Sequence, residues 1–492
     1  MDYRKDYYAV LGIEPSADPE EIKAAYRAMA RRYHPDANPS PEASTRFQEA
    51  QEAYDVLSEP GQRRAYDRLR EREGLKQPPA LVIKPVPSHQ ALPVMDEEQL
   101  LYVMVEISPS PTLQAKRLAF NLGLVVDRST SMQGIRLQRV KDATNYIIDF
   151  LDQSDVFSLV TFNDRAEVVI PAQPQLDKTL AKSRVSTVRS SGGTEILQGL
   201  LAGLGEVDRW RSPAMVNHLI LLTDGQTYGG EKECLQEAEN AAQRQVSITT
   251  MGIGQDWNDK LLDEIARRSG GRSTYIDSAA KVTSVFRECV HSLATVAARG
   301  LRLAVRPADA IRLQGAFQVA PYLQSLPTRE DSMPLGMINA EQVCAVVLEF
   351  LVAPQLTGRV SVASLELSAD IPSVGQQSVM LRQGVEIELV PGLEAVDPVP
   401  PSIVNALGKL AIFRMQEKTM DDLDRGEIEH ASQRLETMAT RLLNVGENEL
   451  AKAALLEAGR LARTGHLSPE GRKRIRYGTR SLSMLPKEIS HD

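Results

Sequence analysis

The sequence predicts a multidomain α/β protein with four folded parts, and three patterns along its 492 residues support this. Residues 1–73 and 399–482 place apolar side chains at helical spacing. Residues 117–298 alternate apolar runs with helical patterns, an order typical of a mostly parallel sheet covered by helices on both faces. Residues 299–398 instead contain strand-like runs with period-two alternation, which indicates antiparallel strands in a β-sandwich-like domain.

The N-terminal part is predicted to form two antiparallel helices joined by a polar tip. The segment Asp18-Pro19-Glu20-Glu21 is typical of a helix start, because acidic side chains favour the positive end of a helix. An apolar stripe follows on this helix, made by Ile22, Tyr26, Met29 and Tyr33. A break at His34-Pro35-Asp36 separates it from a second stripe, made by Phe47, Ala50, Tyr54 and Leu57.

The next segments connect this part to the α/β part. Residues 74–95 are rich in proline and are predicted to be a linker, semi-rigid where the prolines cluster. Residues 96–116 include a strand-like run, which we expect to join the antiparallel strands of residues 299–398. On that interpretation the α/β domain, residues 117–298, is an insertion within the β domain.

Within the α/β part, near-continuous apolar runs are the predicted strands. They cover residues 118–126, 156–162, 166–170, 216–223 and 246–253. The predicted helices lie near 138–151, from 195 onward, near 231–244 and at 260–268. Such runs are typical of parallel strands buried on both faces.

The C-terminal part, residues 399–482, shows three apolar stripes that are separated by glycines. We expect a short helical bundle or a tetratricopeptide-like pair of hairpins, followed by a tail at residues 483–492. The basic run Arg472–Arg476 could contact nucleic acid or an acidic partner, but a solvated helix end is the favoured interpretation.

Composition limits the classes of function. The net charge of −8 gives no global reason to bind nucleic acid or an anionic membrane. The three cysteines form no C-x-x-C pair, which argues against a disulfide framework and a cysteine zinc site. Because the sequence contains neither a signal-peptide pattern nor 18 consecutive apolar residues, we expect a cytoplasmic protein without a membrane span.

The first 70 residues resemble the J-domain family. The resemblance covers the segment before the break, the tripeptide His34-Pro35-Asp36, and the later sequences Ala53–Ser58 and Arg63–Asp67. The family binds a DnaK-type chaperone ATPase and stimulates its ATP hydrolysis. The resemblance implies that the tripeptide is the essential tip and that a basic docking face is formed by Lys23, Arg27, Arg31 and Arg32.

Polar residues follow two buried strands and precede one helix of the α/β part. A D-x-S-x-S pattern places Asp127, Ser129 and Ser131 directly after a strand, and Asp224 ends another. Thr194 lies at a helix start. The carboxyl ends of parallel strands meet at one edge of a sheet, so these side chains can converge there. Two carboxylates and three hydroxyls form an all-oxygen set, which hard cations such as Mg²⁺ prefer.

This arrangement resembles the von Willebrand factor A (VWA) family and its metal-ion-dependent adhesion site, from Phe120 to about Leu293. The resemblance implies a Rossmann-like fold and Mg²⁺, or another divalent cation, held by Asp127, Ser129, Ser131, Thr194 and Asp224. It also implies a protein ligand whose Asp or Glu completes the shell of the metal.

Together the motifs favour a non-enzymatic co-chaperone or adaptor. One alternative is a VWA scaffold, in the manner of VWA proteins that work beside MoxR-type AAA ATPases, with a regulatory J-domain. Another is a metal-dependent hydrolase, which the lack of an evident general base disfavours. No catalytic residue is predicted, and His218 is expected to be structural.

Overall fold

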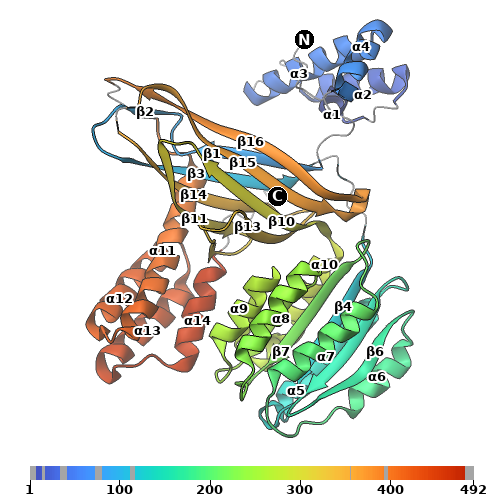
Figure 1. The fold of residues 1–492 in the computed structure, drawn as a ribbon, viewed down its shortest axis with the longest axis vertical. Coiled ribbons are helices and arrows are strands. Elements are labelled where there is room, and N and C mark those ends of the chain that lie inside the picture. The colour runs from blue at the N-terminus through green and yellow to red at the C-terminus, as the bar shows by residue number, and fades with distance from the viewer. Residues whose placement is uncertain are drawn as a thin grey trace. The chain divides into compact units, whose positions relative to one another are not determined.

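The computed structural model describes residues 7–13, 17–33, 41–72, 80–110, 113, 117–354, 356–392 and 397–482 (Figure 1). The chain divides into two compact units. One contains residues 1–82 and 110–114, and the other contains residues 83–109 and 115–492.

The first unit is helical. Its helices are α1 (Tyr7–Leu11), α2 (Pro19–Arg32), α3 (Pro41–Leu57) and α4 (Pro60–Arg72). A capping box begins α2: the Asp18 carboxylate accepts from the Glu21 amide, and the Glu21 carboxylate accepts from the Asp18 amide. The helices pack around a small core that includes Tyr7, Ile22 and Tyr66.

The α/β domain of the second unit is built on a six-stranded sheet in the order β6-β5-β4-β7-β8-β9. Its strands are β4 (Phe120–Asp127), β5 (Val156–Phe162), β6 (Ala166–Pro174), β7 (Val216–Thr223), β8 (Ser247–Ile253) and β9 (Ser273–Ile276). All neighbouring strands are parallel except β5 and β6. Every residue of β4, β5 and β7 is buried, as the apolar runs predicted.

Helices cover both faces of this sheet, and two separate apolar cores result. The helices are α5 (Ile135–Phe150), α6 (Lys178–Thr187), α7 (Ile196–Arg209), α8 (Glu231–Gln243), α9 (Asp259–Ser269) and α10 (Val282–Ala294). One core contains α5 and α10 residues such as Ile147 and Phe286, and the other contains Leu200 of α7 and Leu262 of α9.

The β domain consists of two five-stranded sheets. One has the order β1-β3-β14-β11-β12, from β1 (Leu81–Pro87), β3 (Gln99–Pro109), β14 (Cys344–Val352), β11 (Ile311–Ala320) and β12 (Gln324–Ser325). The other has the order β13-β10-β15-β16-β2, from β13 (Met333–Asn339), β10 (Val296–Pro307), β15 (Gly358–Ile371), β16 (Gln376–Val390) and β2 (Ala91–Pro93). Because β3 pairs with β14 along its length, the chain enters this domain before it forms the α/β sheet and returns afterwards.

The linker predicted at residues 74–95 is wrong from residue 81 onward, because β1 and β2 lie there. Each is the edge strand of its sheet. Proline has no amide hydrogen to donate. It is tolerated in an edge strand because one side of that strand has no neighbouring strand to accept a hydrogen bond. Leu81 and Leu92 are buried and anchor the two strands. The proposed boundary at residue 298 also falls inside a strand, since β10 begins at Val296.

The C-terminal part is helical, with α11 (Pro401–Asp424), α12 (Ile428–Asn444), α13 (Asn448–Thr464) and α14 (Pro469–Arg480). Its apolar core continues into the β domain, since Leu410 and Leu435 share a cluster with Met104 and Val347. None of the helices in the described part of the chain is long and apolar enough to cross a membrane.

His218 of β7 has a structural role that predicts acid sensitivity. Its Nε2 atom lies 2.9 Å from the Thr249 hydroxyl, and burial lowers its pKa from 6.5 to about 4. Between these values the unfolded chain binds a proton that the folded chain excludes, so stability falls as pH falls through this window. The full shift corresponds to roughly 3 kcal/mol. In thermal unfolding at pH values across this window, His218→Gln is expected to lose less stability than wild type, and equal losses would contradict this assignment.

Candidate functional site

The predicted metal residues lie at the carboxyl edge of the central sheet. Asp127 is the last residue of β4, and Asp224 directly follows β7, the parallel neighbour of β4. Thr194 lies two residues before α7. A Cβ atom built on Gly225 would lie 2.9 Å from the Thr194 hydroxyl oxygen, so this hydroxyl lies against the residue after Asp224. Three distant stretches of chain therefore meet at one edge.

Hydrogen bonds link the two carboxylates to the serines between them. Asp127 accepts from the Ser129 amide at 2.7 Å. The Ser129 and Ser131 hydroxyl oxygens are 2.9 Å apart, and Ser131 donates to Asp224 Oδ1 at 2.6 Å. The Thr223 hydroxyl donates to the other oxygen of Asp127 at 2.5 Å. The D-x-S-x-S turn thus brings four of the five predicted ligands into one connected group.

Two buried carboxylates set the electrostatics of this edge. Both carboxylate side chains are buried, and burial raises the pKa of Asp127 to about 6, although hydrogen bonds from Thr223 and Ser129 oppose this shift. The nearby Asp224 charge raises the pKa further. A buried carboxylate is costly unless a positive charge or hydrogen bonds compensate it. The donor set therefore fits an oxygen-seeking divalent cation.

A metal site at this edge would need hydroxyl oxygens among its ligands. Over the described ranges, no group of three or more His, Cys, Asp or Glu side chains could hold a metal ion. A cation at this edge would therefore depend on Ser129, Ser131 and Thr194 as well as on the two carboxylates.

The loops around the edge are tied to one another. The Thr130 hydroxyl donates to the Gly192 carbonyl oxygen at 3.0 Å, and the Gly193 amide donates to Asp164 at 3.1 Å. A Cβ atom on Gly193 would lie 2.5 Å from the ring of Tyr228, which is 76% exposed. Glycine at this position therefore lets an exposed aromatic ring lie against the residue that precedes Thr194.

Sequence reasoning missed three residues here: Arg136, Thr223 and Tyr228. The position of Thr223 next to Asp224, at the end of a strand, is a signal that could have marked it as a residue of this edge. Arg136 pairs with Asp224 at 2.6 Å, yet it lies in the first turn of a helix and carries no signal of its own. Tyr228 lies in a loop whose course the sequence does not reveal.

The chaperone-docking prediction is only partly described by the structure. His34, Pro35 and Asp36 lie outside the described residues. On α2, Arg27 and Arg31 are exposed and Lys23 is half-buried. Arg32 belongs to the same helix, but its side chain is not among those described.

The basic run near the C-terminus is not a solvated helix end, which corrects that interpretation. Lys473 of α14 is buried and donates to the carbonyl oxygens of Gln255 at 2.6 Å and Trp257 at 2.8 Å. Its ammonium also lies 4.2 Å from the centre of the Trp257 ring. The lysine therefore holds α14 against the loop between β8 and α9.

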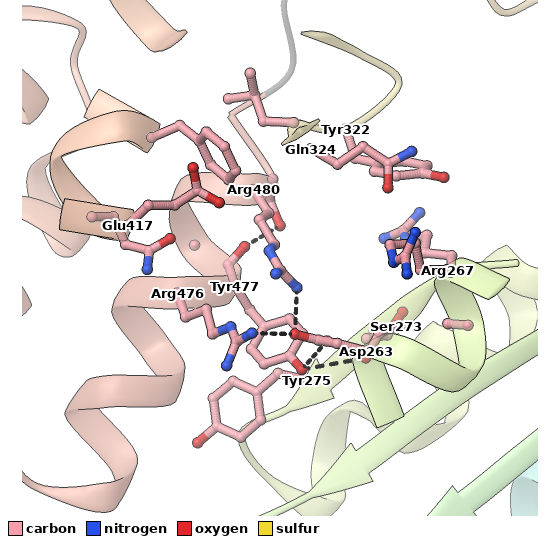
Figure 2. A pocket seen from close by; sticks show the side chains of 18 of the residues that line it. Asp263, Arg267, Ser273, Tyr275, Tyr322, Gln324, Glu417, Arg476, Tyr477 and Arg480 are labelled. Atoms are coloured by element: carbon pink, nitrogen blue, oxygen red, sulfur yellow. Dashed lines mark hydrogen bonds and ion pairs between the residues drawn. The ribbon is translucent and has the colours of Figure 1, made fainter. Parts of the chain in front are cut away.

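Asp263 of α9 forms a second contact with α14. Arg476, Tyr477 and Arg480 all converge on its carboxylate, at 2.7, 2.6 and 2.8 Å (Figure 2). These contacts border a cavity of about 880 Å³ between the α/β domain, the β domain and the C-terminal helices. Within the basic run, Arg476 thus has its acidic partners, Asp259 and Asp263, in the protein's own α/β domain.

Lys473→Met is expected to loosen this docking. The change keeps the apolar stem but leaves two carbonyl groups without their donor, which typically costs about 1–3 kcal/mol. Hydrogen exchange of α14 amides should become faster, whereas Lys452→Met, at an exposed position of α13, should leave the exchange unchanged. Exchange of α14 that is equally slow in both variants would show that the lysine does not hold the helix.

The chain carries a J-domain and a VWA domain. Three family models match it: "DnaJ domain" over residues 6–67, "von Willebrand factor type A domain" over residues 121–288, and "Sll0103-like, C-terminal alpha-helical domain" over residues 401–485. The two predicted domain types are therefore confirmed, and the third match covers the C-terminal helices.

Particular relatives cover different parts of the chain. An uncharacterized protein, sll0103 of Synechocystis, is 27% identical over 388 residues, covering 76% of this chain and 91% of the relative. Chaperone protein DnaJ 2 of Thermus thermophilus is 58% identical over 67 residues, covering 14% of this chain. The chain spans only 24% of that chaperone, so the similarity concerns the J-domain alone.

Solved structures share the fold of the larger unit. A von Willebrand factor type A protein from Catenulispora acidiphila aligns with a TM-score of 0.67 at 18% identity, covering 83% of this chain and 98% of that one. The ArnB paralog VWA2 from Sulfolobus acidocaldarius aligns with a TM-score of 0.53 at 13% identity, covering 82% of this chain and 100% of that one. At these identities the likeness shows the fold alone.

Proposed function

We propose that this protein is a non-enzymatic adaptor that joins a DnaK-type chaperone to a protein held by its VWA domain. The J-domain recruits the chaperone and stimulates its ATP hydrolysis. The VWA domain binds a protein partner through a divalent cation, Mg²⁺ in the first instance. The chemistry takes place on the chaperone, and we place the whole assembly in the cytoplasm.

The J-domain half of the proposal is supported by the sequence match and by the charge of α2. Exposed Arg27 and Arg31 would steer the encounter with an acidic surface of the chaperone. The Asp36 carboxylate could accept charge-assisted hydrogen bonds from a partner arginine. Pro35 would stiffen the tip, because its ring fixes the backbone φ angle.

The VWA half rests on one observation above all: the hydrogen-bonded group that links Asp127 to Asp224 through Ser129 and Ser131. These four residues and Thr194 would hold the cation. The bound ion would supply the positive charge that an Asp or Glu of the partner recognises. Tyr228 lies exposed beside this edge, where it could contact residues flanking that acid.

Calorimetric titration of the chelator-treated full chain with MgCl₂ tests the VWA half. We expect one ion to bind, and thermal unfolding to shift upward with MgCl₂ concentration, because a ligand of the folded state stabilises that state. If neither Mg²⁺ nor Mn²⁺ bound to the chain or stabilised it, metal-dependent binding of a partner by the VWA domain would be rejected. The J-domain half of the proposal would be unaffected.

A further inference from the structure

Arg136 lies in the first turn of α5 and reaches the edge where the five predicted ligands gather. Its Nη1 atom donates to Asp224 Oδ2 at 2.6 Å and lies 3.3 Å from the Ser131 carbonyl oxygen. The Asp224 side chain is fully buried, whereas that of Arg136 is 36% exposed. A buried carboxylate is thus neutralised by a guanidinium that retains access to solvent.

The neighbouring loop leaves room for this guanidinium. Gly254 has a φ angle of +71°, and a Cβ atom there would lie 3.1 Å from Arg136 Nη2. The loop is fixed on both sides, since the Gly254 amide donates to the Ile276 carbonyl at 3.0 Å and its carbonyl accepts from the Trp257 indole at 2.9 Å. The loop that borders the Arg136 side chain is therefore held in position by hydrogen bonds within the domain.

The two carboxylates of the edge are compensated differently. Asp127 accepts only from neutral donors, the Ser129 amide and the Thr223 hydroxyl, among the contacts of the described residues. Asp224 has one oxygen bonded to Ser131 and the other to Arg136. A divalent ion that uses Asp224 must share this carboxylate with a positive charge already in contact with it.

We propose that Arg136 is an internal competitor for the divalent cation, holding Asp224 when no ion is bound and setting how tightly the ion binds. This inference rests on the proposed metal binding by the VWA domain. A guanidinium is always protonated, so its competition with the ion does not disappear at any physiological pH. Its partial exposure lets it swing toward solvent when the ion takes its place on the carboxylate.

Titration of the chelator-treated full chain with MnCl₂, followed by calorimetry and by electron paramagnetic resonance of free Mn²⁺, tests this role. Arg136→Ala is expected to bind the ion roughly tenfold more tightly than wild type, because a like charge a few ångströms from the ion is removed. Arg136→Lys keeps the charge and should stay near the wild-type affinity. Arg139→Ala is the matched control, since Arg139 lies one turn further along α5 and pairs with Asp142 on the surface.

The outcomes separate this inference from the proposed function. Tighter binding of Mn²⁺ by Arg136→Ala than by wild type, Arg136→Lys and Arg139→Ala supports the competitor. Wild-type binding that Arg136→Ala leaves unchanged or weakens overturns the competitor but not the metal site. Failure of wild type and of every variant to bind Mn²⁺ overturns both the competitor and the metal site. Arg136→Gln, which also lacks the charge, must repeat the result of Arg136→Ala, and a disagreement between the two would overturn the charge explanation.

Discussion

Full-length protein carrying His34→Gln is expected to leave ATP hydrolysis by a DnaK-type chaperone at its basal rate. Glutamine preserves polarity but replaces the imidazole at the tip that the J-domain resemblance makes essential. Leaving a buried polar group at an interface without its hydrogen-bond partner costs about 1–3 kcal/mol, and about 1.4 kcal/mol corresponds to tenfold, so stimulation should fall by about tenfold or more. Single-turnover ATPase assays with the purified chaperone measure this loss.

His430→Gln provides the control for that experiment. His430 is exposed on α12 of the C-terminal helical domain, where its ring lies 3.4 Å from Glu427. Its substitution should leave stimulation intact. Stimulation that survives His34→Gln unchanged would remove the chaperone half of the proposed function.

Asp127→Asn is expected to abolish ion binding by the VWA domain and, with it, capture of the partner. The substitution keeps the shape of the side chain but removes one of the two buried carboxylates among the five proposed ligands. Loss of an outer-shell partner alone typically weakens metal binding about 10–100-fold, so removal of a ligand charge should weaken it by about 100-fold or more. Titration with MgCl₂ measures the first effect, and recovery of bound proteins in Mg²⁺ measures the second.

Asp149→Asn is the matched control, because Asp149 lies exposed on α5 of the same domain and pairs with Lys182. It should bind Mg²⁺ as wild type does. If Asp127→Asn folded normally and still bound the ion with wild-type affinity, the five-residue site would be misassigned.

The parts of the fold that the sequence predicted best are those where the pattern of burial is simple. Strands β4, β5 and β7 are buried at every residue, and each is a near-continuous apolar run in the sequence. The meeting of Asp127 and Asp224 at one sheet edge was equally accessible, because each lies at the end of such a run and parallel strands bring their ends together. Local sequence and topology here point to the same answer.

The parts that could not be predicted depend on contacts between distant segments. The edge strands β1 and β2 contain prolines that also suit a linker, and only their pairing partners distinguish the two. The basic residues of α14 resemble a solvated helix end until Asp263 and the carbonyl groups of Gln255 and Trp257 are placed against them. Arg136 is likewise one of many helical arginines until its contact with Asp224 is seen.

In the proposed function, binding of the chaperone by the J-domain and binding of the partner by the VWA domain are independent of each other. The alternative predicted from the sequence, a VWA scaffold with a regulatory J-domain, makes capture of the main partner depend on Asp127 alone. Both interpretations require that the chaperone and the VWA partner bind through different residues of the chain, so single substitutions should separate them.

The most direct test is capture of cellular proteins on immobilised full-length chain, compared between wild type, His34→Gln and Asp127→Asn in Mg²⁺ and again in chelator. The adaptor account predicts that His34→Gln loses only the DnaK-type chaperone, that Asp127→Asn loses only the VWA partner, and that chelator reproduces the second loss in wild type. Recovery of the same proteins from all three baits, with or without the ion, would contradict it.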